Sequence, residues 1–312
     1  MANYLYNIRF SEFETELCKL EFKALFGFEL DEKIFVTHKL INPSISPYIK
    51  NRLEVIYKAS DLEDILKYII KDHLKAEDFM VKYIQLYKED DHFKQRKEIC
   101  KKVGYVITGE PDFKDPKIKF GVLYFNNEWY LGLLEENNPK WRDHNNKPHS
   151  YSSSLGINVA KAILNIGAGG DFNKTIIDPC CGVGTVLLEA GFAGYNISGW
   201  EINKKVAWNA RENIAHFKYP IKVTIGDIKD VDEEYDVSIV DLPYGNFSLT
   251  TKDNQIKIIE EAKRISKRLV IISSEDISQV LDGLGLKTIE KCSLNKRINK
   301  RFMRYIWVCE SQ

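Results

Sequence analysis

Residues 175–190 read TIIDPCCGVGTVLLEA, and this stretch decides the fold. An apolar run from Thr175 to Ile177 ends at Asp178-Pro179, glycines follow at 182 and 184, and an apolar helical pattern begins at Thr185. A strand, an acid, a glycine turn and a helix in this order form the nucleotide-binding crossover of doubly wound α/β sheets. The stretch therefore predicts the first strand and helix of a Rossmann-like sheet.

Leu187 distinguishes this turn from the dinucleotide-binding version. The dinucleotide fingerprint has its third glycine at that position, where it allows the helix to pack closely on the strand. A leucine there argues against a turn built for a pyrophosphate, and so against a nicotinamide-dependent dehydrogenase. The pattern favours a nucleoside that lacks a pyrophosphate, such as S-adenosylmethionine.

Length and composition describe an ordinary globular chain. Its 312 residues, 44% hydrophobic and 29% charged, are enough to bury the cores of two domains. We expect a cytoplasmic protein that does not bind membranes, because no apolar run reaches the length of a membrane span and residues 1–10 lack a secretion signal. The six cysteines form no CxxC pair, so we expect reduced thiols and no metal site.

A polar run at 137–154 separates two parts of the chain, so we expect domains at residues 1–137 and 138–312. The first part begins with a strand, helix, strand and helix, which is typical of an α+β ferredoxin-like layer. A basic helix and a hairpin follow. The expected strands are 4–9, 34–40, 79–86, 119–125 and 129–134, and the expected helices are 12–26, 61–72 and 92–102.

From residue 155 onward, helical patterns alternate with short buried strand patterns. This order predicts an α/β domain with an open, mostly parallel, doubly wound sheet and an antiparallel C-terminal hairpin. Its ligand crevice should lie at the carboxyl ends of the first strands. The expected strands are 175–178, 197–201, 221–225, 236–240, 269–273, 286–292 and 302–309, and the expected helices are 155–166, 184–193, 204–216 and 255–266.

Four acids each follow the end of an expected strand: Asp178, Glu201, Asp227 and Asp241. Each alone could cap a turn or a helix, but four in register favour one shared crevice. We expect Glu201 to bind ribose hydroxyls, Asp227 the adenine amine and Asp178 a methionine amino group, whose carboxylate would meet the helix N-terminus. The expected cofactor-binding residues are Asp178, Cys180, Gly182, Gly184, Thr185, Glu201, Ile202, Asp227, Ile228 and Asp241.

The fourth acid opens the run Asp241-Leu242-Pro243-Tyr244-Gly245. The lone pair of an exocyclic amine is delocalised into its ring, and a carboxylate that accepts the amine hydrogens can localise it. The proline fixes the backbone, and the tyrosine offers a face on which a base can stack. We therefore expect Asp241, Leu242, Pro243 and Tyr244 to be catalytic, although a tight Asp-x-Pro turn would also fit this run.

These residues resemble the class I S-adenosylmethionine-dependent methyltransferases, in particular the amino-methylating branch with its (Asp/Asn/Ser)-Pro-Pro-Tyr motif. Residues 178–190 are similar to the Asp-Pro-x-Cys-Gly-x-Gly-Thr-x-Leu-x-Glu-Ala block of the RNA guanine-N2 group, which includes tRNA guanosine-10 N2-methyltransferases. Residues 142–155, here called the connecting segment, match another motif of that group through Arg142, Lys147, Pro148, Ser154 and Leu155. Residues 104–134, with Asp112 to Pro116, are similar to the end of a THUMP domain.

The resemblance implies a Rossmann-like class I methyltransferase domain preceded by a ferredoxin-like and THUMP-like RNA-binding region. It implies S-adenosylmethionine as cofactor, S-adenosylhomocysteine as product, RNA as partner, and guanine N2 in tRNA as the methyl acceptor. Leu242 departs from the family motif, which has proline there, and the THUMP-like segment is short. Two alternatives stay open: an adenine-N6 methyltransferase acting on DNA or rRNA, and a catalytically weak RNA-binding homologue. No protein partner is indicated.

Contacts with RNA must come from local basic patches, since 45 basic residues balance 45 acidic ones. One patch lies within 291–304, and the other contains Lys94, Arg96, Lys97, Lys101 and Lys102. Either could also be a solvated face. We expect His144 and His149 to be solvated as well. The expected RNA-binding residues are Arg142, Lys147, Lys296, Arg297, Lys300 and Arg301.

Overall fold

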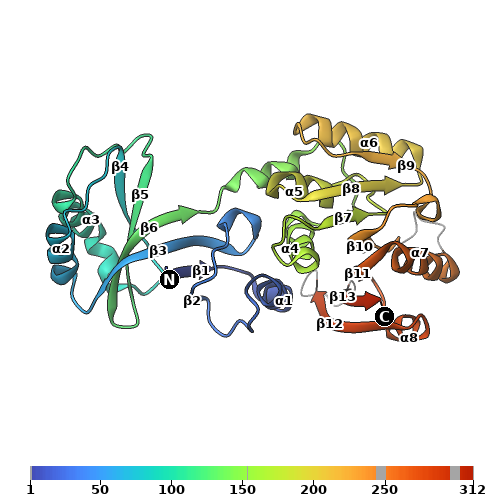
Figure 1. The fold of residues 1–312 in the computed structure, drawn as a ribbon, viewed down its shortest axis with the longest axis horizontal. Helices are drawn as coiled ribbons and strands as arrows, with labels where there is room; N and C mark the ends of the chain where they lie inside the picture. The colour runs from blue at the N-terminus through green and yellow to red at the C-terminus, as the bar shows by residue number, and fades with distance from the viewer. Residues whose placement is uncertain (1, 153, 244–250, 296–302, 312) are drawn as a thin grey trace. The chain divides into compact units, whose positions relative to one another are not determined.

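The computed structural model describes residues 2–152, 154–243, 251–295 and 303–311 (Figure 1). Contacts divide the chain into two compact units. The first unit comprises Met1–Arg9, Asp31–Ser44 and Tyr48–Asn137, and the second comprises Phe10–Leu30, Ile45–Pro47 and Asn138–Gln312. No helix among the described residues is long and apolar enough to cross a membrane.

The first unit is built on a six-stranded sheet in the order β2-β1-β3-β6-β5-β4. Its pairs are antiparallel except for the parallel pair of β4 and β5. The bounds are β1 Tyr4–Ile8, β2 Ile34–Thr37, β3 Ile49–Ala59, β4 Phe79–Tyr83, β5 Ile118–Phe125 and β6 Glu128–Glu136. Asn126 and Asn127 form the β5–β6 turn at φ values of 50° and 61°, which suits the two-residue hairpin turn.

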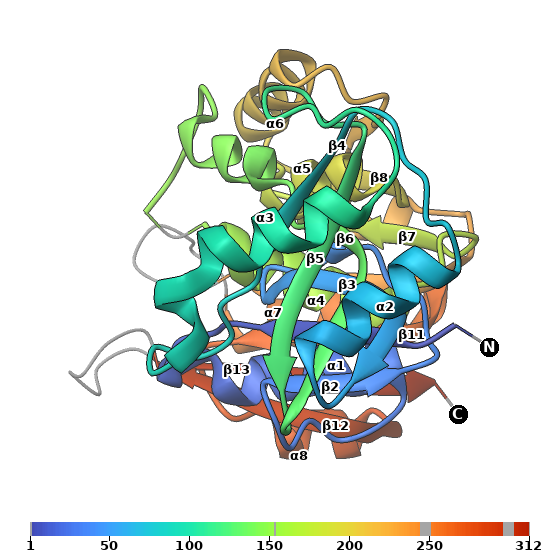
Figure 2. The same ribbon diagram turned by 90° about the vertical axis from the view of Figure 1, so that its left-hand side faces the viewer.

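Two helices cover one face of this sheet, α2 (Leu62–Lys71) and α3 (Arg96–Val106), and Figure 2 looks onto them. A 3₁₀ turn at Asp91–Gln95 precedes α3. The helices bury Ile65, Ile69, Ile99 and Val103 against sheet residues such as Phe120. The first unit is therefore an α+β layer, as the sequence predicts. Its assignment as a THUMP-like, RNA-binding region stays a prediction.

Helix α1 (Thr15–Phe26) does not take the place that the predicted ferredoxin-like layer gives it. The sequence places this helix on the first sheet, but it packs on α4 and β12 of the second unit instead. Its buried Glu21 carboxylate accepts hydrogen bonds from Asn165 Nδ2 at 2.6 Å and Ser46 Oγ at 2.7 Å. An acid buried in this way needs those donors, and both belong to the second unit. The place of α1 is thus set by tertiary contacts.

The second unit has a seven-stranded sheet in the order β12-β13-β11-β10-β7-β8-β9. The pairs from β11 to β9 are parallel, whereas β13 pairs antiparallel with β11 and with β12. This confirms the predicted doubly wound sheet and its C-terminal hairpin. The strand bounds are β7 Thr175–Asp178, β8 Asn196–Glu201, β9 Val223–Ile225, β10 Tyr235–Asp241, β11 Ser266–Ser273, β12 Leu286–Asn295 and β13 Met303–Ser311.

The helices of this unit lie on both faces of the sheet (Figure 1). Their bounds are α4 Ile157–Ala168, α5 Thr185–Ala193, α6 Lys204–His216, α7 Lys252–Ile265 and α8 Ser278–Gly283. From β7 the chain adds β8 and β9 on one side of the sheet and then returns to add β10 on the other side of β7. The direction in which strands are added therefore reverses between β7 and β10. In sheets of this kind the ligand crevice lies at that reversal, at the carboxyl ends of the strands.

Candidate functional site

The glycine turn after β7 makes backbone hydrogen bonds both within itself and to β8. Cys181 N–H donates to Trp200 O at 2.9 Å, and Gly184 N–H donates to Cys181 O at 2.8 Å. Gly182 and Gly184 have φ values of 55° and 82°, where residues with a side chain are strained. A Cβ on Gly182 would meet no atom of the described residues within 4 Å, so this side of the turn can be approached by a ligand.

Leu187 packs where the dinucleotide fold needs its third glycine, and a glycine on the neighbouring strand makes room for it. A Cβ added to Gly199 of β8 would lie 2.5 Å from Leu187 Cδ1 and 3.1 Å from Cys181 Sγ. The helix therefore still packs closely on the sheet, as in the dinucleotide fold. Here the glycine that allows this lies on the strand, at Gly199, and the helix carries the larger side chain. Leu187 stands out in the sequence pattern, whereas its packing partner Gly199 does not.

The four acids that follow strands meet around the glycine turn. The pKa of the Cys180 thiol is raised by burial and by the charges of all four acids: Asp178, Glu201, Asp241 and Asp227. The Glu201 carboxylate accepts the Gly182 N–H at 3.0 Å and the Asn203 N–H at 2.8 Å. Asp227 is more exposed and accepts the Lys229 N–H at 3.2 Å. The structure thus brings together residues that are 63 positions apart in sequence.

Burial and mutual repulsion make the acid cluster resist ionisation. The pKa of Asp178 is raised well above its ordinary value by burial, and then by the charges of Asp241 and Glu201. Burial also raises the pKa of Asp241 to about 7, although the Arg304 guanidinium acts in the opposite direction. Burial raises the pKa of Glu201, against the N–H groups that its carboxylate accepts. A cationic ligand would relieve this repulsion, because it favours the ionised form of each acid.

Two buried oxygens at this edge have no hydrogen-bond partner among the described residues, Thr185 Oγ1 and Asp241 Oδ1. Leaving such groups unpaired costs about 1–3 kcal/mol each. A ligand with hydrogen-bond donors and a positive charge could satisfy both the oxygens and the acids. The residues at this site therefore fit a cationic nucleoside such as S-adenosylmethionine.

The loop after β10 is described as far as Pro243. Leu242 is 1% exposed and lies in the apolar core, so the expected catalytic role of its side chain is corrected. Its N–H donates to Ile272 O at 3.0 Å, a bond that the family's proline could not make. Pro243 O accepts a hydrogen bond from Gln255 Nε2 at 2.8 Å. Tyr244 lies outside the described residues.

Two further residues of the expected cofactor set differ in their surroundings. Ile202 is largely exposed, whereas Ile228 is buried in the same core as Leu242. The Ile228 side chain packs into that core from the 3₁₀ turn Ile228–Asp230, and its part in cofactor binding stays a prediction.

The comparison with known families decides between a methyltransferase and other nucleoside-binding proteins. The model of RMKL-like methyltransferase domains matches residues 144–300. The chain belongs to this family. The match confirms the resemblance inferred from the glycine turn and the Asp241 loop.

Individual relatives of this RMKL-like methyltransferase have low sequence identity to it. The tRNA (guanine(10)-N2)-dimethyltransferase of Methanothermobacter thermautotrophicus is 26% identical over 249 residues, covering 75% of this chain and 72% of that protein. The protein of the same name from Methanocaldococcus jannaschii is 23% identical over 266 residues, covering 78% and 72%. TrmN from Thermus thermophilus, a solved structure, is 15% identical with a TM-score of 0.49, covering 99% of this chain and 100% of that chain.

The connecting segment of the RMKL-like methyltransferase is built in part from buried polar groups that sequence reasoning missed. His144, expected to be solvated, is 1% exposed. Its Nδ1 lies 2.7 Å from Glu189 Oε1 and its Nε2 lies 3.0 Å from Tyr219 Oη. Lys161 Nζ lies 3.4 Å from the other Glu189 oxygen. Lys161 and Glu189 within otherwise apolar helices were the available signal, since buried charges are found in pairs.

The expected RNA-binding residues fall into three groups. Arg142 is exposed and lies over the Trp141 ring at 5.3 Å. Burial lowers the pKa of Lys147, although the Glu189 charge opposes this effect. Four expected residues lie outside the described part of the chain: Lys296, Arg297, Lys300 and Arg301. The structure therefore leaves the roles of all six as predictions.

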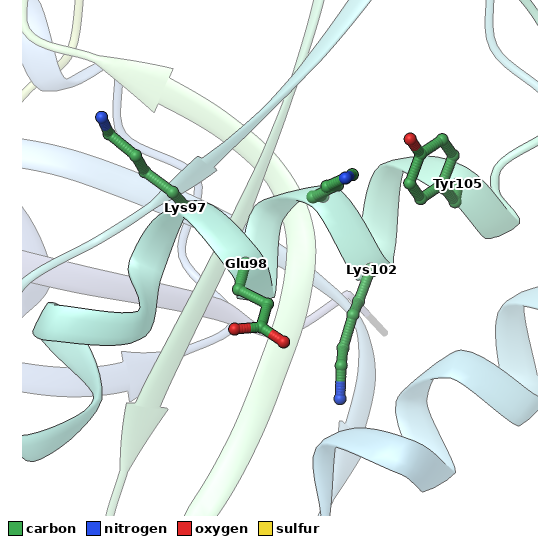
Figure 3. A pocket seen from close by; sticks show the side chains of 5 residues that line it. Lys97, Glu98, Lys102 and Tyr105 are labelled. Carbon is green, nitrogen blue, oxygen red and sulfur yellow. The ribbon is translucent and has the colours of Figure 1, made fainter.

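The basic residues of the patch in the first unit differ in their contacts. Arg96 lies over the Phe93 ring at 4.1 Å, and Lys102 pairs with Glu63 at 3.2 Å. Lys97 and Lys101 form no ion pair with any described residue, and Lys101 Nζ lies 5.4 Å from the centre of the Tyr105 ring. Lys97, Lys101, Lys102, Glu98 and Tyr105 line a hollow along the outer side of α3 (Figure 3). Within the described residues, these two lysines and the exposed Tyr105 ring are the part of this patch that no acidic side chain neutralises.

Proposed function

We propose that the protein is an S-adenosylmethionine-dependent N-methyltransferase that modifies an exocyclic amine of a base in RNA, with guanine N2 in tRNA as the target. One observation carries the chemistry: Asp241, at the end of β10, has a buried oxygen with no hydrogen-bond partner among the described residues, and burial raises the pKa of this carboxyl to about 7. The choice of guanine in tRNA is supported by the names of the archaeal relatives. The cytoplasmic location stays a prediction.

The acid cluster suggests which groups hold the cofactor. We assign the ribose hydroxyls to Glu201, whose carboxylate also accepts hydrogen bonds from backbone N–H groups, among them those of Gly182 and Asn203. Asp227 takes the adenine amine, and Asp178 faces the cationic amino group. Thr185 Oγ1, at the start of α5, lies where the helix N-terminus attracts a carboxylate. When bound, S-adenosylmethionine supplies the methyl group as an electrophile.

Asp241 supplies the remaining chemistry through Oδ1, for which the described part of the chain offers no hydrogen-bond donor. Oδ1 accepts one hydrogen of the target amine and keeps the amine lone pair directed away from the carboxylate. As the amine nitrogen gains a bond and becomes positive, its proton passes to Oδ1. A carboxyl group with a pKa of about 7 is well matched to take a proton near neutral pH. The low polarity of the buried site strengthens its interaction with the developing charge.

The test measures binding and methyl transfer separately. Purified wild type and Asp241→Ala are incubated with S-adenosylmethionine and unfractionated tRNA, and modified nucleosides are identified by mass spectrometry. We expect N2-methylguanosine with wild type and its loss in the variant, with the cofactor Kd from calorimetry changed by less than about threefold. Asp236→Ala, at the opposite end of β10, is the matched control and should retain activity. Formation of N6-methyladenosine would contradict the guanine assignment, and equal loss of cofactor binding would contradict the role given to Asp241.

A further inference from the structure

Asn213 of α6 connects the glycine turn to the connecting segment. Its side chain is fully buried. Nδ2 donates to Val183 O in the glycine turn at 2.9 Å and to His149 O in the connecting segment at 2.9 Å. Oδ1 accepts the His149 N–H at 2.9 Å. One side chain thus joins two backbone segments that lie more than thirty residues apart in sequence.

The rest of α6 supports the same two segments. A Cβ added to Gly184 would lie 3.5 Å from Ala210 Cβ, so the helix backs the glycine turn directly. Asn209 Nδ2 donates to Tyr151 Oη at 2.7 Å, and His149 also pairs with the Glu212 carboxylate. Asn213 differs from these neighbours because it reaches both segments at once and does so through their backbones.

Only an amide satisfies this arrangement. The side chain has to donate two hydrogen bonds to carbonyl oxygens and accept one from an N–H group, and asparagine provides all three. Aspartate keeps the acceptor but turns an oxygen toward two carbonyl oxygens. Alanine leaves all three backbone groups without this partner. The backbone of Val183 would then lose a contact that fixes the turn between its two left-handed glycines.

We propose that Asn213 is a positioning residue of the cofactor site, which holds the glycine turn against the connecting segment and thereby sets the affinity for S-adenosylmethionine. This inference rests on the proposed function, since it concerns the same cofactor. The consequence is specific: loss of Asn213 weakens cofactor binding while leaving the Asp241 chemistry in place. KM for the cofactor therefore rises, and kcat changes little.

Asn165 provides a matched control for a purely structural role. It is also an asparagine in a helix of the second unit, also fully buried, and it also makes three side-chain hydrogen bonds. Its amide donates to Glu21 Oε1 at 2.6 Å and Ile45 O at 2.8 Å and accepts from Tyr195 Oη at 2.9 Å. None of these partners belongs to the glycine turn or the connecting segment.

The experiment compares Asn213→Asp and Asn165→Asp in the full chain. Calorimetry with S-adenosylmethionine gives Kd, methyl transfer to tRNA gives kcat and KM, and urea unfolding gives stability. We expect Asn213→Asp to raise Kd and cofactor KM by about tenfold or more, with kcat within about threefold of wild type. Asn165→Asp should lose stability without a change in Kd. If Asn213→Asp does not fold, Asn213→Ala takes its place.

Two outcomes would overturn the inference: a Kd for the Asn213 variant within twofold of wild type, or equal rises in Kd for both variants at similar losses of stability. Failure of the wild type to bind S-adenosylmethionine would instead overturn the proposed function. The two failures are therefore distinguishable in one set of titrations.

Discussion

Replacing Asp241 by asparagine should stabilise the folded protein above about pH 7. Burial raises the pKa of this carboxyl to about 7 in the folded state, against about 4 in an unfolded chain. Between these values the folded protein retains a proton that the unfolded chain has lost, so the free energy of unfolding falls as pH rises through this window. Above about pH 7 the carboxyl is ionised in both states, and the free energy of unfolding is lower by the full amount, on the order of 4 kcal/mol at 1.36 kcal/mol per pH unit. The opposing attraction of Arg304 is already contained in the raised pKa.

Urea unfolding without cofactor measures this effect directly. At about pH 8, Asp241→Asn should be more stable than wild type by up to about 4 kcal/mol, and at about pH 4 the two should be equal. Asp236→Asn is the control from the same strand. The pKa of Asp236 is lowered by the Thr175 N–H and by Lys267, so that variant should lose stability at about pH 8. A stability difference for Asp241→Asn that is negative, or that does not vary with pH, would refute the reasoning.

Three further predictions concern the ligand, the packing and the RNA surface. Affinity for S-adenosylmethionine should fall as pH drops and Asp178 and Glu201, whose pKa values are raised, lose their charge; the fall should be steeper than for S-adenosylhomocysteine, which lacks the sulfonium charge, and parallel pH profiles in calorimetry would contradict this. Gly199→Ala should destabilise the second unit by about 1–3 kcal/mol in urea unfolding because the added methyl overlaps Leu187, and a neutral result would show that the helix can shift. Replacing Lys97 and Lys101 by glutamine should reduce the salt dependence of tRNA binding by about one unit of slope for each lysine that contacts phosphate, and an unchanged slope would identify a solvated face.

Local signals were sufficient for the elements that carry the site. The observed bounds of β7 and α6 are those that the sequence predicts. Asp178-Pro179 ends the strand, because proline lacks the N–H that a ladder requires. Asn203 begins α6, where its side chain accepts the Lys205 N–H at 3.0 Å and the Val206 N–H at 3.3 Å. The clustering of the acids followed from the parallel sheet alone.

Other features depend on contacts that no local pattern contains. Strand β3 went unrecognised because charged and polar residues interrupt its apolar positions, and a register shift between Val55 and Tyr57 breaks its alternation. His144 lies in a polar stretch typical of a loop, and its burial depends on Glu189 and Tyr219, which lie 45 and 75 positions later. The position of α1 depends in the same way on Asn165, 144 residues after Glu21.

The chain passes between its two units at residues 9–10, 30–31, 44–45, 47–48 and 137–138. A single cut therefore does not separate a complete catalytic half from the rest. A fragment of residues 138–312 would lack α1, and Asn165 would lose both the Glu21 carboxylate and Ile45 O. The methyl-transferring part is thus poorly suited to exchange as a cassette between proteins. Gene fusions and recombination events that preserve it have to carry the first fifty residues along, and with them strands β1 and β2 of the first sheet.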